Sequence, residues 1–321
     1  MLLPLGSQAL AAEVELRPLR VSNQAPLAKL CGLPTLDRAR LLADGEHEAG
    51  FSWDLSNNYT LAGNAREQLS FDGESHRFAI RLDRGLSDGW EIGAELLVIA
   101  HRRGALDGFV EGWHDFFGLP EGGRDQAASG QLTYSYEKDS RSLFSVRDDE
   151  GGLGDLRLLL SRQLHAAADA SLALHASVEL PTGDGRELLG SGSVDVALWV
   201  SAEHLWRPAG QRLSLHGGGG LLASDSGEIL SSQRRPLVGT GTLGLAWSTW
   251  SWLALQIQFD AHTSLFDGSG LRPIDGASAQ MAIGGAAAVA ERTRLELAVV
   301  EDIVVATAPD VSFHLLLSQR F

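Results

Sequence analysis

The chain has 321 residues, which is enough for one large all-β domain or two smaller domains. Its 41 acidic residues outnumber its 26 basic residues, and the net charge of -15 argues against a nucleic-acid-binding protein, which needs clustered Lys and Arg. The sequence has no apolar run of the roughly 18 to 20 residues that a membrane-spanning helix needs. A mean hydropathy of -0.03 nevertheless suits membrane barrel strands, because they alternate lipid-facing and lumen-facing residues.

The first twelve residues are interpreted as the remnant of a signal peptide. Met1 to Leu5 is an apolar run, and Ala9 to Ala11 fits an A-x-A cleavage site. The basic region that normally precedes such a run is missing, so we expect the true start of the signal to lie upstream. The alternative interpretation is the frayed end of a cytosolic chain.

Residues 13–45 show no barrel-strand pattern. Thr35 to Ala43 is predicted as a short helix with Thr35 as its N-cap. The segment is either a plug that folds into a barrel lumen or a linker in the periplasm, and the sequence does not decide between them.

From residue 46 to residue 321 the chain is a series of segments with period-two patterning. Between Ser251 and Leu265, Leu253, Leu255, Ile257 and Phe259 share one face, and Gln256, Gln258, Asp260 and His262 share the other. Residues two apart share a face only in a strand. We therefore predict an all-β fold, a closed antiparallel transmembrane β-barrel.

The connections alternate between short turns and long polar loops, as in bacterial outer-membrane barrels. Long loops are expected at Asn57–Glu74 and Arg102–Ser129, and a short periplasmic turn at Glu137–Ser142. If Arg141 to Arg147 is a strand, the count is about fourteen, and otherwise about twelve. Because an open edge cannot face lipid, the first strand (46–57) should pair with the last (310–321).

Charged side chains on the strands are too costly to face lipid, so we expect them to face the lumen. The candidates are Asp54, Arg77, Arg81, Glu91, Glu95, His175, Glu179, Asp195, Glu203, Asp260, His262, Arg294, Glu296 and Asp302.

The loop from Gly104 to Arg124 is predicted to contain one short amphipathic helix that ends before Pro120. This helix either lies on the outer leaflet or acts as a lid or hydrophobic capture site. Its candidate residues are Asp107, Phe109, Trp113, His114, Phe116 and Phe117.

Aromatic residues mark the membrane boundaries and the C-terminus. Five tryptophans, Trp90, Trp206, Trp247, Trp250 and Trp252, lie near the short turns, where a membrane barrel carries an aromatic girdle. The last strand resembles the signal read by the barrel-assembly machinery, through Phe313, Leu315, Leu317 and Phe321.

Chemical motifs are scarce. Cys31 is the only cysteine, so the chain has no paired zinc or redox motif. Gly239 to Gly244 matches G-x-G-x-x-G but lies inside a predicted strand, whereas a dinucleotide site needs a strand-to-helix turn. We predict no catalytic residue, no metal and no cofactor.

Several short motifs together resemble a family of uncharacterised outer-membrane proteins of Gram-negative bacteria. They are Asn23 to Leu27, Leu106 to Phe109 with His114 and Phe117-Gly118, Arg124, Gly152 to Asp155, Glu179 to Gly183, and Pro309 to Val311. The resemblance spans nearly the whole chain and implies a membrane barrel without an established activity. By architecture alone, the chain is more distantly similar to the fatty-acid and aromatic-hydrocarbon channels of the outer membrane.

The leading functional hypothesis is a passive channel or transporter for small molecules, including hydrophobic ones, in the bacterial outer membrane. Because the lumen candidates contain more acids than bases, an open pore should prefer cations. The alternatives are an enzyme that modifies lipid or lipopolysaccharide, and a structural or surface barrel with a blocked lumen. The expected partners are outer-membrane lipid, lipopolysaccharide, the barrel-assembly machinery and an unknown small solute.

Overall fold

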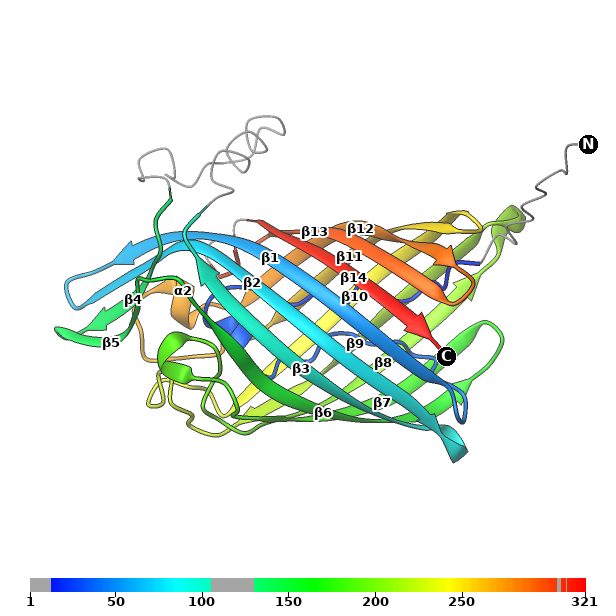
Figure 1. Cartoon of the computed structure of the whole chain (residues 1–321), viewed down its shortest axis with the longest axis horizontal. Coiled ribbons are helices and arrows are strands. Elements are labelled where there is room, and N and C mark those ends of the chain that lie inside the picture. Colours follow the sequence, from blue (N-terminus) through cyan, green and yellow to red (C-terminus); the bar gives the residue numbers. More distant parts are fainter. Residues whose placement is uncertain (1–12, 105–129, 305–306, 310) are drawn as a thin grey trace, which may run out of the picture.

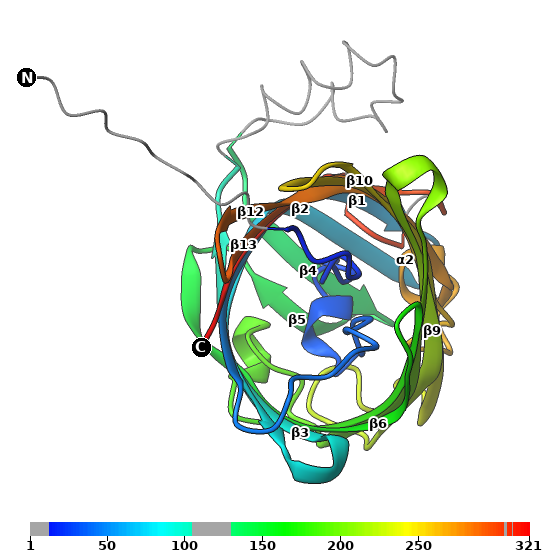
Figure 2. The same ribbon diagram turned by 90° about the vertical axis from the view of Figure 1, so that its right-hand side faces the viewer.

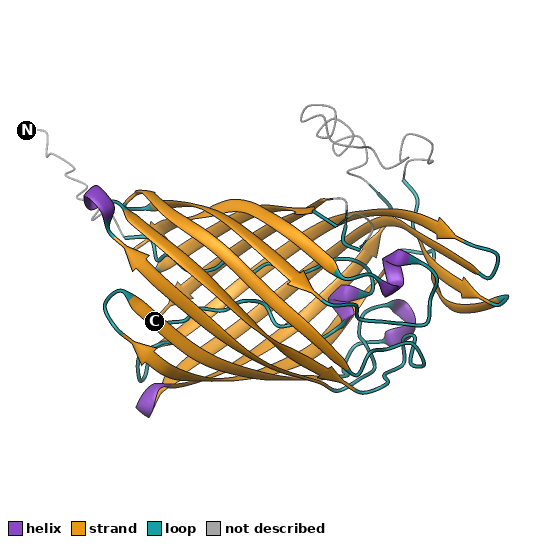
Figure 3. Cartoon of the chain, turned by 180° about the vertical axis from the view of Figure 1, so that it is seen from behind, coloured by secondary structure: helices purple, strands orange, loops and turns teal. Residues whose placement is uncertain are grey.

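The computed structural model describes residues 13–104, 130–304, 307–309 and 311–321. Fourteen strands form one antiparallel sheet, and twelve of them close a barrel while β4 and β5 project from one end (Figures 1 and 3). The barrel strands are β1 (His47–Gly63), β2 (Glu67–Leu86), β3 (Trp90–Arg102), β6 (Glu150–Ala166), β7 (Ala170–Leu180), β8 (Asp195–Trp206), β9 (Arg212–Ser224), β10 (Leu237–Trp250), β11 (Leu253–His262), β12 (Ser278–Ala290), β13 (Thr293–Asp302) and β14 (Val311–Arg320). The predicted all-β barrel is confirmed.

The barrel closes where the sequence predicts. On β1, Trp53 lies opposite Leu315 of β14 and opposite Phe78 of β2, so the first strand joins the last. Closure leaves no unpaired edge among the strands of the wall, which is the condition for a sheet surrounded by hydrocarbon.

Side chains alternate across the wall. On β11, Leu255 and Phe259 are 48% and 44% exposed on the outer face, while Gln256 and Gln258 are buried on the inner face. The outer face is apolar over most strands, with Ile80, Leu153, Leu198, Leu243, Ile283 and Leu297 among its exposed residues. Among the described residues, no helix has the length and apolarity to cross a bilayer.

The two ends of the barrel differ. One end, here called the turn end, carries short connections such as η2 (Ser87–Gly89) and η5 (Pro208–Gly210) and the C-terminus (Figure 1). The opposite loop end carries longer connections with η4 (Gly185–Glu187) and the four-residue helix α2 (Arg272–Asp275). Trp90, Trp206, Trp250 and Trp252 are exposed beside the short turns.

Strands β4 (Thr133–Lys138) and β5 (Arg141–Val146) form a hairpin outside the closed barrel. β4 pairs with the first residues of β2, where Glu67 lies opposite Lys138, beyond the end of β3. The turn at Glu137–Ser142 therefore lies at the loop end, and its predicted periplasmic position was wrong. Length alone does not show which end of a barrel a turn occupies.

Two further local predictions were wrong. The expected loop Asn57–Glu74 is mostly strand, because β1 continues to Gly63 and β2 begins at Glu67. The expected helix Thr35 to Ala43 is absent. Its backbone bonds the wall instead, with Leu41 N donating to Gln163 Oε1 at 2.8 Å, and these contacts replace the hydrogen bonds of a helix.

Candidate functional site

Residues 13–46 run inside the barrel, and Figure 2 shows this segment within the ring of strands. We call it the plug and divide it into an ascending arm (13–24), a head (25–33) and a descending arm (34–46). The ascending arm begins at the turn end, where Val14 N donates to Ser251 O at 2.7 Å. The descending arm returns there, where Gly45 N donates to Gly85 O at 3.1 Å. Two lengths of chain therefore traverse the lumen.

Wall side chains bind the backbone of the ascending arm. Leu19 N donates to Gln258 Oε1, and Gln258 Nε2 donates to Leu19 O, both at 3.0 Å. Arg20 N donates to Glu296 Oε1 at 2.9 Å, and Arg20 Nη2 donates to Glu95 Oε2 at 2.9 Å. An extended segment without a strand partner must satisfy its peptide groups in this way.

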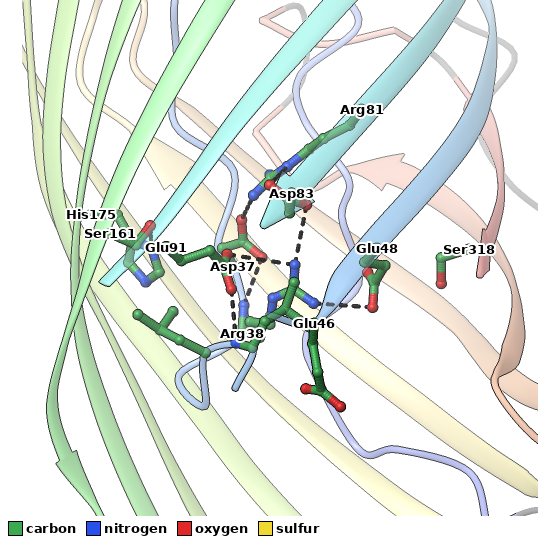
Figure 4. A network of polar contacts seen from close by, with 12 residues as sticks. Asp37, Arg38, Glu46, Glu48, Arg81, Asp83, Glu91, Ser161, His175 and Ser318 are labelled. Atoms are coloured by element: carbon green, nitrogen blue, oxygen red, sulfur yellow. Dashed lines mark hydrogen bonds and ion pairs between the residues drawn. The ribbon is translucent and has the colours of Figure 1, made fainter. Parts of the chain in front are cut away.

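The descending arm is anchored by Arg38, which is buried and lies among three carboxylates of the wall (Figure 4). Its guanidinium nitrogens lie 3.0 Å from Glu48, 3.1 Å from Asp83 and 3.5 Å from Glu91. Glu48 also accepts two hydrogen bonds from Arg17 Nη1, at 2.9 and 3.0 Å. One wall carboxylate therefore holds both arms.

Asp37 forms the reciprocal contact from plug to wall. Its carboxylate lies 2.5 Å from Arg81 Nη2. Burial opposes ionisation of Asp37, but Arg81, Arg20 and Arg38 outweigh this effect and hold the pKa of its carboxyl well below the usual range. Asp37 is therefore charged and paired.

The head is held by apolar contacts at the loop end. It packs in a cluster with residues of the wall, the projecting hairpin and the long loops, which we call the cap. The cap includes Leu27, Leu30, Cys31, Leu33, Phe71, Tyr134, Phe144, Leu188, Trp199, Ile229, Phe266 and Ile274. Apolar side chains from loops far apart in sequence thus cover the plug where it turns.

One polar cluster lies beside the cap. Lys29 Nζ donates to Ser75 Oγ at 2.5 Å, and Ser75 Oγ lies 3.0 Å from His101 Nδ1 and 3.1 Å from Tyr134 Oη. His101 Nε2 lies 3.0 Å from Leu188 O and donates to it, so Nδ1 is the acceptor for the Ser75 hydroxyl. A serine activated by a histidine has this geometry, but Ser75 and His101 are 2% and 0% exposed. The cluster fixes the head to the wall.

A continuous belt of alternating charge crosses one half of the inner wall. Each member lies within 4 Å of the next, on seven neighbouring strands from β13 to β7. In order, the belt is Arg294, Glu296, His314, Asp54, Arg77, Glu95, Arg157 and Glu179. Arg20 of the plug pairs with Glu95 of this belt at 2.9 Å.

Two glycines of the wall lie where the descending arm comes very close to it, Gly218 on β9 in the half opposite the belt and Gly85 on β2, which also carries a belt residue. At Gly218, a Cβ atom would lie 2.5 Å from Leu36 Cδ1 and 2.2 Å from Val200 O. At Gly85, it would lie 2.1 Å from Ala43 O. Glycine at these two positions lets the descending arm lie directly against the wall.

The structure places the predicted lumen residues as follows. Ten of the fourteen are buried, and Glu203, Asp260, His262 and Asp302 are half-buried. Six belong to the belt, and Arg81 and Glu91 contact the descending arm.

Asp195 accepts from Gly32 N of the head at 2.7 Å and pairs with Arg234. His175 lies between Ser161 and Ser201, Glu203 accepts from Ser214, Asp260 accepts from Thr242, and His262 contacts Asn23.

Several residues of the site were not predicted from the sequence. Glu48, Asp83 and His314 lie on the charged faces of their strands, and the alternation that identified Asp54 and Arg81 could have identified them too. The plug residues Arg17, Arg20 and Arg38 follow no period, and the sequence gives no pattern that points to them.

The remaining predicted residues lie outside the lumen or outside the described residues. Phe313, Leu315, Leu317 and Phe321 follow the outward alternation of β14, with Leu317 and Phe321 44% and 63% exposed. The candidates of the outer loop, Asp107, Phe109, Trp113, His114, Phe116 and Phe117, lie outside the residues that the structure describes.

Residues 3–321 match the family model described as "Protein of unknown function (DUF3187)". The chain belongs to the DUF3187 family. This match covers nearly the whole sequence and confirms the predicted family of uncharacterised proteins. No functionally curated protein matches the sequence.

Solved structures similar to this DUF3187 barrel include the COG4313 outer membrane channel from Pseudomonas putida F1. It has a TM-score of 0.57 and 15% identity, over 88% of this chain and 98% of that chain. The KdgM porin in complex with disordered oligogalacturonate follows at a TM-score of 0.44, with 7% identity over 85% of this chain and 99% of that chain. The CymD monoaromatic hydrocarbon channel has a TM-score of 0.37 and 9% identity, over 98% of this chain and 97% of that chain. The first likeness establishes the barrel fold, and the other two structures superpose on this chain less closely.

Proposed function

We propose that the protein is an outer-membrane channel for small molecules that is closed at rest by its own N-terminal plug. The observation that carries this proposal is the passage of both plug arms through the lumen, each bound to the wall by buried ion pairs. A barrel that served only as a surface scaffold could fill its lumen with wall side chains. A separate, extended segment can instead move out of the lumen.

The charge distribution supports a pore that opens when the plug leaves. The fourteen lumen candidates include nine carboxylates and three arginines. The plug supplies Arg17, Arg20 and Arg38 to carboxylates of the wall. Removing the plug would leave these carboxylates without their cations, so the open pore should prefer cations.

The proposed location is the outer membrane, with the turn end in the periplasm. The apolar outer face, the exposed tryptophans at the turn end and the closed hydrogen-bonding of the wall support it. In that location the outer face contacts lipid and lipopolysaccharide, and the Phe321 end of β14 is presented to the assembly machinery.

Removing Phe321 should lower the amount of heat-modifiable barrel in outer-membrane fractions, whereas Gln319→Ala should leave it unchanged.

The test of the channel is single-channel conductance in planar bilayers, for the full chain and for a variant lacking residues 13–45. We expect rare or no openings from the full chain and steady, cation-preferring conductance from the variant. Equal steady conductance from both would show that the plug does not close the lumen. Silence from both, with the variant folded by circular dichroism, would favour a permanently blocked barrel.

A further inference from the structure

Two glutamines of the inner wall bind the peptide groups of the plug, one in each arm. Gln258 on β11 accepts from Leu19 N and donates to Leu19 O, both at 3.0 Å. Gln163 on β6 accepts from Leu41 N at 2.8 Å and donates to Ala39 O at 2.7 Å. A side-chain amide offers the same donor and acceptor as the backbone of a neighbouring strand. These two glutamines therefore bind the backbone of a chain that runs through the lumen.

Wall carboxylates accept from further peptide groups of the plug. Glu296 accepts from Arg20 N at 2.9 Å, and Glu91 accepts from Leu42 N at 2.8 Å. Every residue except proline carries this N–H group. The backbone contacts therefore do not depend on which side chain the bound residue carries.

The wall also binds the guanidinium groups of the ascending arm. Arg17 Nη1 donates to Glu48 at 2.9 Å, and Arg17 Nη2 donates to Ser318 Oγ at 2.8 Å. Arg20 Nη2 donates to Glu95 at 2.9 Å. Charge-assisted hydrogen bonds of this kind are stronger than those between neutral groups. The lumen thus binds two chemical features together, a peptide backbone and arginine side chains.

This pair of features restricts what can replace the plug. A replacement must donate to the glutamine amides, accept from them, and supply cations to Glu48 and Glu95. An aromatic hydrocarbon offers none of these groups. A polyamine offers cations and donors but no carbonyl oxygen for the Gln258 amide. A peptide that contains arginine offers all three.

We propose that the lumen binds a short arginine-containing peptide from outside the chain in place of the plug, and that such peptides are the substrate class of the channel. The plug is then an internal competitor that occupies the substrate site. This inference rests on the proposed function, because the plug must leave before a peptide can enter. The two can still fail separately. Conductance without peptide binding contradicts only the peptide site, and peptide binding without conductance contradicts only the channel.

The experiment is fluorescence anisotropy of a dye-labelled synthetic peptide with the sequence of residues 13–24, titrated with the purified full chain in detergent and with its Arg38→Met variant. Arg38 anchors the descending arm, so its loss should raise the fraction of chains whose lumen is free. Saturable binding at least tenfold tighter in Arg38→Met is expected, because a competing peptide binds only the undocked fraction. Arg40→Met is the matched control, exposed in the same arm, and should keep the native affinity. Absence of saturable binding, or equal affinity in all three chains, overturns the proposal.

A methylated peptide tests the backbone contact. Methylation of the Leu19 nitrogen removes the N–H from which Gln258 accepts, so binding to the Arg38→Met chain should weaken about fivefold, as for one lost hydrogen bond. In a chain that also carries Gln258→Leu, the same methylation should weaken binding by less than about twofold, because the partner is already gone. Equal losses in the two chains would show that Gln258 does not bind this peptide group, and would overturn the proposal.

Three further ligands test the substrate class on the Arg38→Met chain. A peptide in which the leucines and valines of residues 13–24 are exchanged should bind within about tenfold of the original, since its backbone, arginines and apolar content are kept. A peptide with glutamine in place of both arginines should bind at least tenfold more weakly. Spermidine at the same concentration should not displace the labelled peptide. Loss of binding after the leucine–valine exchange would restrict the site to the plug's own sequence, and displacement by spermidine would reduce it to a cation site. Either result overturns the proposal.

Discussion

The descending arm and the head of the plug are held by different kinds of contact. Arg38 in the arm lies among Glu48, Asp83 and Glu91, whereas Leu27 in the head lies in the apolar cap. Buried ion pairs add little net stability but are costly to break, because the remaining partner is left charged and buried. Apolar packing is non-directional and scales with buried area. The arm therefore fixes where the plug lies, and the cap supplies most of the favourable energy of keeping it there.

Cys31 makes this comparison measurable. It is the only cysteine of the chain and is 4% exposed within the head. Burial raises the pKa of its thiol to about 12, so a thiol reagent should react only when the head leaves the cap. The rate of Cys31 labelling thus reports undocking of the plug.

The largest effect is expected from Arg38→Met. It leaves three wall carboxylates without this cation and should weaken docking by about 3–5 kcal/mol, which is roughly a hundredfold or greater rise in the labelling rate of Cys31. Arg40→Met is the matched control, since Arg40 is exposed in the same arm. An unchanged rate in Arg38→Met would mean that the head undocks while the arm stays bound.

A smaller effect is expected from Leu27→Ala in the cap. Loss of a buried leucine side chain should weaken docking by about 2–4 kcal/mol. Unlike the change in Arg38→Met, this loss should be insensitive to salt between low and high ionic strength. The double variant should show additive free energies if the plug undocks as one unit. A double variant no faster than Leu27→Ala alone would contradict a single unit.

A pH dependence should arise within the head. Burial lowers the pKa of Lys29 well below its ordinary value, and Ser75, His101 and Tyr134 face it from the wall and the projecting hairpin. The docked plug therefore binds fewer protons than the released plug, so docking should strengthen as pH rises between the lowered and the ordinary pKa. The ratio of the labelling rate in the native chain to that in Lys29→Met should fall with rising pH. A ratio independent of pH would show that Lys29 stays protonated when docked.

The smallest effect is expected from Arg66→Gln. Arg66, in the connection between β1 and β2, pairs with Asp139 at the tip of the projecting hairpin at 2.6 Å, but both side chains are exposed. Exposed pairs contribute little because water and salt screen them. The labelling rate of Cys31 should change by less than about twofold, and a larger change would show that the projecting hairpin controls the cap.

Strand alternation explains why the fold could be predicted and the site only in part. The pattern that separates Leu255 and Phe259 from Gln256 and Gln258 follows from the pleat of a single strand, without any other part of the chain. The same pattern identified Asp54 and Arg294 as inward-facing. It could not show that Arg77 and His314 both pair with Asp54, because these residues meet only when the barrel closes.

The sequence by itself determined the barrel, since period-two alternation over successive segments satisfies both the backbone and an apolar surround only in a closed sheet. Only the tertiary structure decided that twelve strands close while β4 and β5 project. The pairing of Glu67 on β2 with Lys138 on β4 cannot be predicted from the residue pattern of either strand. It also decided the place of residues 13–46, which have no period. Their position depends on contacts such as Arg17 with Ser318, which lie 301 residues apart and form only inside the finished barrel.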